Sequence, residues 1–104
     1  MPQVKSILAS GVLTQSKTSV YTVAPGKRAY IKNIRVTDPN SSFTIQFYRA
    51  NYPSEDSLLY RYELDQGDIL DDDTEYIMEP DTSIVAMSSA LTTQFTIDGY
   101  EESI

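Results

Sequence analysis

Residues 20–36 constrain the fold of this chain more than any other stretch, because they join two β-rich runs through a Pro-Gly turn. Pro25 presets the backbone of the first central turn position, and Gly26 tolerates the positive φ that a type II turn needs at the second. Val, Tyr, Thr and Ile, which favour a pleated and half-buried surface, lie on both sides of the turn. We therefore predict a β-hairpin here, with the remaining strands added to it.

The second run of this hairpin departs from strict alternation at Ile31 and Ile34. Their odd spacing would place the two side chains on opposite faces of a regular strand. A β-bulge near residues 32–33 would allow Ile31, Ile34 and Val36 all to be buried. The alternative is that one isoleucine faces outward against a neighbouring subunit.

Short β-like runs separated by turn residues make up the rest of the chain. We expect an edge strand over residues 6–14 and further strands over 43–49, 58–64, 75–78, 83–87 and 93–98. The run 58–64 would carry Leu58, Tyr60, Tyr62 and Leu64 on one face. Loops are expected at 37–42 and 51–56, a turn at 65–68, and an acidic interruption at 71–73.

About eight short strands without helical periodicity predict an all-β fold, an antiparallel β-sandwich or jelly roll. We expect one domain over residues 1–104, with flexible ends at 1–5 and 101–104. The predicted buried residues are Val23, Ile34, Val36, Phe43, Ile45, Phe47, Phe95 and Ile97.

Composition argues against catalysis. The chain contains no Cys, His or Trp, so the thiolate nucleophile, the usual general base and the commonest nitrogen ligand of metals are all missing. Paired carboxylates could hydrolyse glycosides, but so acidic a chain brings carboxylates together by chance. We therefore expect no enzyme activity and no cofactor.

No apolar run suits a secretion signal or a membrane span, which favours a cytoplasmic protein or one assembled there.

The charged residues are distributed unevenly along the chain. All eight basic residues occur up to Arg61, together with three acidic ones, and twelve acidic residues follow. Surfaces of opposite sign could then meet between copies of the chain. The alternative is that strands of the two halves interleave and average the charge. The net charge of −7 argues against nucleic acid as a partner.

The run Asp71, Asp72 and Asp73 is a weak candidate for Ca²⁺ binding, because hard cations prefer clustered carboxylates. It lacks the spaced ligand order of a calcium loop, so a solvated and self-repelling loop is the favoured interpretation.

Tyrosines on strands indicate protein contacts, since several must face outward if their neighbours are buried. Some could instead lie at strand ends with only the hydroxyl in water. With the two bases of the turn, the interface candidates are Tyr21, Lys27, Arg28, Tyr30, Tyr48, Tyr60 and Tyr62.

Several short motifs follow one another along the chain. A Tyr-Thr-Val run at 21–23 precedes a Pro-Gly-Lys turn at 25–27, and a hydrophobic-Lys-x-Ile-x-Val strand follows at 31–36. A Gly-Asp-Ile-Leu step at 67–70 and a Phe-Thr-Ile-Asp-Gly strand at 95–99 complete the order. This order resembles that of the small β-sandwich virion proteins of tailed bacteriophages. The similarity covers residues 20–100, and its motifs are structural.

This resemblance implies a non-enzymatic virion structural protein. Capsid decoration or cement is the leading role, and head-fibre, tail and baseplate proteins also occur in the group. It further implies the virion as location, a homo-oligomer with a trimer favoured, and contact with other virion proteins such as the major capsid protein, but not with membranes. The alternative is a receptor- or carbohydrate-binding module of a tail fibre or baseplate. The acidic run at 71–73 is not part of the shared pattern.

Overall fold

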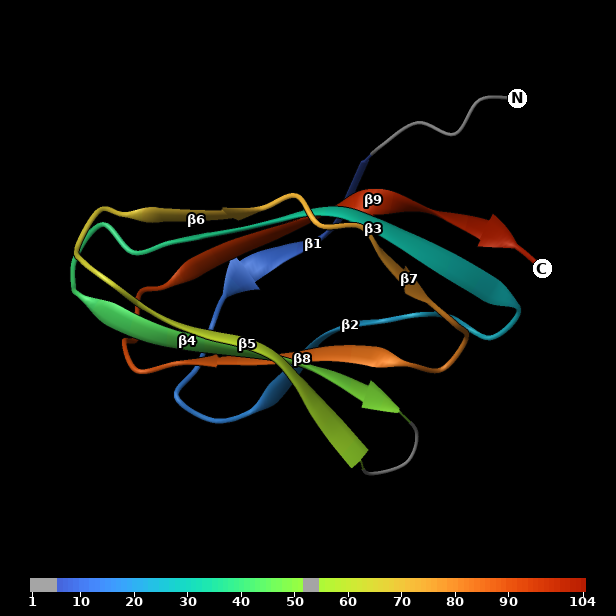
Figure 1. The fold of residues 1–104 in the computed structure, drawn as a ribbon, viewed down its shortest axis with the longest axis horizontal. Coiled ribbons are helices and arrows are strands. Elements are labelled where there is room, and N and C mark those ends of the chain that lie inside the picture. Colours follow the sequence, from blue (N-terminus) through green and yellow to red (C-terminus); the bar gives the residue numbers. More distant parts are fainter. Residues whose placement is uncertain (1–5, 52–54) are drawn as a thin grey trace.

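Two antiparallel sheets face each other across an apolar core in this computed structural model, which describes residues 6–51 and 55–104 (Figure 1). Nine strands are formed: β1 (Ser6–Val12), β2 (Thr18–Thr22), β3 (Lys27–Thr37), β4 (Phe43–Asn51), β5 (Glu55–Leu64), β6 (Ile69–Asp72), β7 (Tyr76–Met78), β8 (Ser83–Ser88) and β9 (Gln94–Ser103). The all-β sandwich expected from the sequence is confirmed. The described ranges contain no helix that could cross a membrane.

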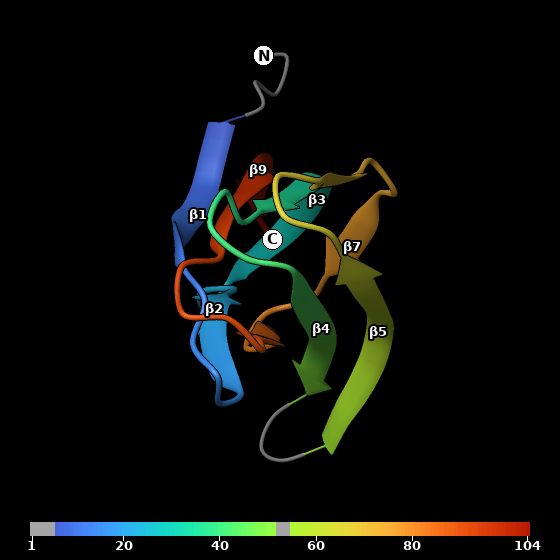
Figure 2. The same ribbon diagram turned by 90° about the vertical axis from the view of Figure 1, so that its left-hand side faces the viewer.

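The two sheets differ in size and in the course of the chain through them. The larger sheet has the order β1-β9-β3-β6, and β7 also pairs with β3 beyond the end of β6. The smaller sheet has the order β2-β8-β4-β5. Figure 2 shows β1 and β2 on one side of the sandwich and β5 and β7 on the other. The edge formed by β5 therefore faces the edge formed by β6 and β7.

The predicted hairpin is wrong, although its turn is present. Lys27 N donates to Ala24 O at 3.1 Å, and Gly26 has φ +76°. However, β2 pairs with β8 and β3 pairs with β6, β7 and β9, so the two runs lie in different sheets. After β2 the chain stays beside the smaller sheet, where Val23 N donates to Thr82 O at 2.9 Å. The turn thus carries the chain from one sheet to the other.

The predicted bulge in β3 is confirmed. The register with β9 shifts between Ile31 and Asn33, which leaves Lys32 as the extra residue. Ile31, Ile34 and Val36 are all fully buried as a result. Neither isoleucine faces outward, so the alternative of a contact through one of them is wrong.

All eight residues predicted to be buried are buried. In β4 the alternation places Phe43, Ile45 and Phe47 in the core. The sequence missed five further apolar members of the same cluster: Leu13, Ala29, Met78, Ile84 and Ala86.

The prediction that Leu58 lies on the same face of β5 as Tyr60 is wrong. Tyr60 pairs with Phe47 and Leu58 pairs with Tyr48, so Leu59 is an extra residue opposite β4. Leu59 and Tyr60 pack against the core, whereas Leu58 is 55% exposed. The bulge therefore moves Leu58 to the outer face.

Three expected boundaries also differ. Asp71 and Asp72 belong to β6 and do not interrupt a strand. The chain is not frayed over 101–103, because β9 continues to Ser103, which pairs with Lys27. The expected loop over 51–56 is shorter, since Asn51 pairs with Glu55. Residues 52–54, and the end predicted to be flexible at 1–5, lie outside the described residues.

Candidate functional site

A cleft lies between β5 and the edge formed by β6 and β7, where the two sheets face each other. We call it the Tyr–Asp cleft, after the residues that line it: Tyr60, Tyr62, Tyr76, Asp71, Asp72 and Asp73. Leu59 and Leu70 complete its apolar part. Its volume is about 290 Å³. The cleft unites tyrosines and aspartates that the sequence singled out separately.

Tyr60 and Tyr62 form the wall contributed by β5. The two ring centroids are 5.4 Å apart, and the rings are inclined at 44°. Tyr60 reaches the core, where its ring lies 5.3 Å from that of Phe47. Tyr62 is 48% exposed at the mouth. The wall is therefore an aromatic corner with one anchored and one accessible ring.

The opposite wall, from β6 and the segment after it, is acidic. The Asp72 carboxylate accepts hydrogen bonds from the Tyr76 hydroxyl at 2.8 Å and from Thr74 N at 3.0 Å. Asp71 accepts from the Asn33 amide and lies 3.7 Å from the Arg35 guanidinium. A carboxylate has about four acceptor positions, so Asp72 retains capacity for a further donor.

The side chains of Asp71 and Asp72 diverge from each other. In β6, Asp71 pairs with Arg35 and Asp72 with Ile34, so the two side chains leave the strand on opposite faces. Within the ranges 6–51 and 55–104, no group of three or more His, Cys, Asp or Glu side chains could hold a metal ion. The weak metal candidates Asp71, Asp72 and Asp73 thus line a cleft without sharing a cation position.

Burial raises the pKa of two tyrosines in the cleft, Tyr60 and Tyr76. It raises the pKa of Tyr60 well above the usual value, and the negative charge of Asp72 raises it further. Burial and then the hydrogen bond to Asp72 raise the pKa of Tyr76 to about 12. The Tyr60 hydroxyl is buried and has no hydrogen-bond partner among the described residues. It lies beside the Asp72 carboxylate, which also raises its pKa.

The other predicted interface tyrosines lie at separate places. Tyr30 stacks on Tyr100 with centroids 4.9 Å apart, and its hydroxyl donates to Glu102 at 2.6 Å. Tyr48 lies on the smaller sheet, with Lys17 Nζ 4.1 Å from its ring centroid. The Tyr21 hydroxyl donates to Glu101 at 2.5 Å and links β2 to β9. The predicted set is therefore not one site.

Every basic residue that the structure describes contacts its own chain. Ion pairs join Arg28 to Glu79, Lys32 to Glu75, Arg35 to Asp71 and Arg61 to Glu63. Lys27 donates to Ser103 Oγ at 3.2 Å, Arg49 donates to Ile77 O at 3.0 Å, and Lys17 lies over Tyr48. The strands of the basic and acidic halves interleave, and the two charges meet within one molecule.

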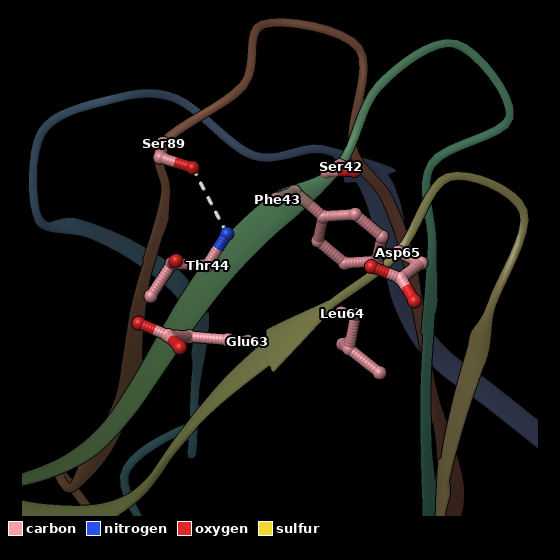
Figure 3. A pocket seen from close by; sticks show the side chains of 7 residues that line it. All are labelled: Ser42, Phe43, Thr44, Glu63, Leu64, Asp65 and Ser89. Atoms are coloured by element: carbon pink, nitrogen blue, oxygen red, sulfur yellow. Dashed lines mark hydrogen bonds between the residues drawn. The ribbon is translucent and has the colours of Figure 1, made fainter.

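A second hollow, of about 430 Å³, lies at the ends of β4 and β5 (Figure 3). Thr44 N donates to Ser89 Oγ at 2.9 Å on one side. Figure 3 shows the carboxylates of Glu63 and Asp65 well apart, with the Phe43 ring near Asp65. Phe43 is almost fully buried, so this hollow has no accessible aromatic wall. The Tyr–Asp cleft is therefore the better candidate.

Sequence reasoning missed Tyr76 and Leu59 as members of the cleft. Tyr76 pairs with the buried Ile31, which places it on the inner face of β7. That pairing is a contact between distant segments and leaves no local signal. Leu59 enters the cleft through the β5 bulge, which the alternation of the sequence did not reveal.

The chain matches no protein-family model, and comparisons with curated proteins and with solved structures give no significant match either.

Proposed function

We propose that this chain is a non-enzymatic structural protein of a bacteriophage virion that self-associates and attaches to a larger protein assembly. Capsid decoration or cement is the leading role. Two observations support the proposal: the order of the motifs in residues 20–100, and the two-sheet sandwich in which those motifs lie. The proposal also agrees with the chemistry of the cleft, which offers phenols and carboxylates but no Cys nucleophile and no His base, because the chain contains neither residue.

An outward-facing row on the larger sheet, made of two half-buried tyrosines and one exposed isoleucine, carries the proposal. Tyr30 pairs with Tyr100 of β9 on one side and with Ile77 of β7 on the other. The neighbours of Tyr30 in β3, Ala29 and Ile31, are fully buried, so this row faces outward. Ile77 is 49% exposed. Aromatic and aliphatic side chains on a flat outer face are typical of contacts between proteins.

The free sheet edges argue for association through faces. Register shifts occur in β1 between Ile7 and Ala9, in β2 between Ser19 and Tyr21, and in the β4–β5 pair at Leu59. Bulges on outer strands discourage edge-to-edge pairing with another chain. Because Arg28 already pairs with Glu79 and Glu102, the contact depends mainly on apolar and aromatic burial.

Sedimentation equilibrium at low and high salt tests the self-association. We expect an oligomer, a trimer by the resemblance, that persists at high salt because apolar burial is not screened. Ile77→Ser should shift the equilibrium toward monomer. Leu91→Ser is the matched control, since Leu91 is 70% exposed and lies in the loop between β8 and β9, outside the row.

Co-sedimentation with phage heads and tails tests the attachment. Binding to heads supports capsid decoration, and binding to tails alone supports a tail component. A monomer at all concentrations and both salts, captured by neither particle, contradicts the proposal.

A receptor- or carbohydrate-binding module of a tail fibre or baseplate is the second candidate. The observation that favours it is the Tyr–Asp cleft, because tyrosine rings and carboxylates are groups that can hold a sugar. A glycan array separates the two candidates, since decoration requires no glycan binding.

A further inference from the structure

The charge that this molecule presents to a partner is negative. Its described bases are engaged within the chain, whereas Asp73 of the Tyr–Asp cleft has no basic partner in the described ranges. Acidic side chains outnumber basic ones and give the chain a net charge of −7, so some carboxylates have no basic partner. A partner that complements this surface is basic.

The shape of the cleft limits what part of a partner it can receive. Its volume of about 290 Å³ suits a single side chain better than a large ligand. The rings of Tyr60 and Tyr62, inclined at 44°, enclose a corner and do not form a flat floor. A flat floor would suit stacking on a pyranose ring. A corner of aromatic faces suits a compact cation, which is attracted to the ring faces.

The hydrogen-bonding groups of the cleft also suit a compact cation. The Asp72 carboxylate has acceptor positions left beside Tyr76 and Thr74 and can accept an N–H. Ammonium and guanidinium groups are donors only. Asp73 adds a carboxylate at the rim.

We propose that the Tyr–Asp cleft receives the cationic side chain of an arginine or lysine from a basic segment of another virion protein. The inference rests on the proposed function and specifies the chemistry of the partner. A second copy of this chain is a poorer source, because the bases of the described ranges would have to leave contacts such as Arg28–Glu79 and Lys32–Glu75.

Titration of the isolated chain with a tetra-arginine peptide, followed by NMR and calorimetry, tests the cleft. Tetra-lysine, the neutral analogue tetra-citrulline and lactose are the comparison ligands. We expect tetra-arginine to shift signals of the cleft residues, tetra-lysine to bind there as well, and added salt to weaken both. Tetra-citrulline and lactose should not bind.

Variants locate the contact. Tyr62→Ala should weaken binding of tetra-arginine about threefold to thirtyfold, the range of one cation–π contact. Asp73→Asn should weaken it several-fold. Asp65→Asn is the control, because it removes the same charge outside the cleft, and it should stay within about twofold of wild type. Circular dichroism checks that each variant is folded.

The outcomes separate this inference from the proposed function. Equal affinity of Tyr62→Ala, Asp73→Asn and wild type, equal binding of tetra-citrulline, or lactose binding in place of the peptides overturns the cation site. Heads or tails that capture Tyr62→Ala as well as wild type also overturn it, while the virion role stands. Peptide binding in the cleft without capture by any particle contradicts the virion role instead.

Discussion

Gly99 lies directly against the carbonyl group of Tyr30, so closely that a Cβ atom at position 99 would be 2.0 Å from the Tyr30 oxygen. The contact occurs where the β3 bulge begins, since Gly99 pairs with Ile31 and the register shifts at the next residue. The bulge that buries Ile31 and Ile34 together therefore depends on a glycine in the neighbouring strand.

Gly99→Ala should destabilise the protein by about 3 kcal/mol, the upper end of the usual cost of overpacking, because the obstructing atom is backbone and cannot move away as a side chain would. Chemical denaturation measures the loss. Gly11→Ala is the control, since its added Cβ would meet the Phe95 ring at an ordinary 3.5 Å and should change stability by less than about 1 kcal/mol. Equal effects of the two substitutions would contradict the close approach.

Phe47→Ala should cost about 3–5 kcal/mol of unfolding free energy, the usual loss for a buried aromatic side chain. Phe47 is fully buried and its ring lies 5.3 Å from that of Tyr60, so the truncation also removes support for the Tyr–Asp cleft. A denaturant titration measures the loss. Leu91→Ala, at an exposed position, should change stability by about 0.5 kcal/mol or less. A loss below about 1 kcal/mol for Phe47→Ala would show that the core is not built around it.

Asp38 should make the fold sensitive to acid. Its carboxylate is fully buried and accepts hydrogen bonds from Asn40 N at 2.9 Å, Thr92 Oγ1 at 2.8 Å and Thr93 Oγ1 at 3.0 Å. Burial alone would raise the pKa of Asp38, but these donors outweigh it and hold the pKa below the usual value. A lowered folded-state pKa stabilises above the unfolded value of about 4, and this stability is lost as the pH falls through the folded value.

Melting temperatures of wild type and Asp38→Asn between neutral and strongly acidic pH measure this contribution. We expect the variant to be less stable at pH 7, because an amide oxygen replaces only part of the carboxylate's acceptor capacity. The difference between the two proteins should shrink as the pH falls below about 4. A difference that stays constant over this range would contradict the role assigned to Asp38.

Calcium at millimolar concentration should leave the melting temperature almost unchanged. Asp71 contacts Asn33 and Arg35, and Asp72 contacts Thr74 and Tyr76, so the carboxylates do not converge on one point. Calcium at a concentration of about 100 times the Kd of a site would stabilise the protein by about 2.7 kcal/mol, which is roughly 10 °C or more for a domain of this size. Scanning fluorimetry with calcium and with a chelator measures the shift. A clear rise with calcium would show a cation site formed by these residues.

The sequence by itself determined the fold class, eight of the buried positions, the bulge in β3 and the turn at Gly26. Alternation in β4 identifies Phe43, Ile45 and Phe47 because side chains on a strand face opposite sides in turn. The odd spacing of Ile31 and Ile34 requires a bulge if both are buried. The turn at Gly26 follows from a positive φ that glycine adopts without strain. Each of these features depends on near neighbours in the chain.

Only the tertiary structure decided which strands pair and where the cleft lies. A Pro-Gly turn is a local signal for a hairpin between β2 and β3. In the structure, however, β2 pairs with β8, and β3 pairs with β6, β7 and β9 in the other sheet. The Tyr–Asp cleft requires β5 of one sheet to face β6 and β7 of the other. The bulge at Leu59 is equally hidden, because it exists only relative to the register with β4. Strand pairing and sheet packing join residues far apart in sequence, so no local pattern encodes them.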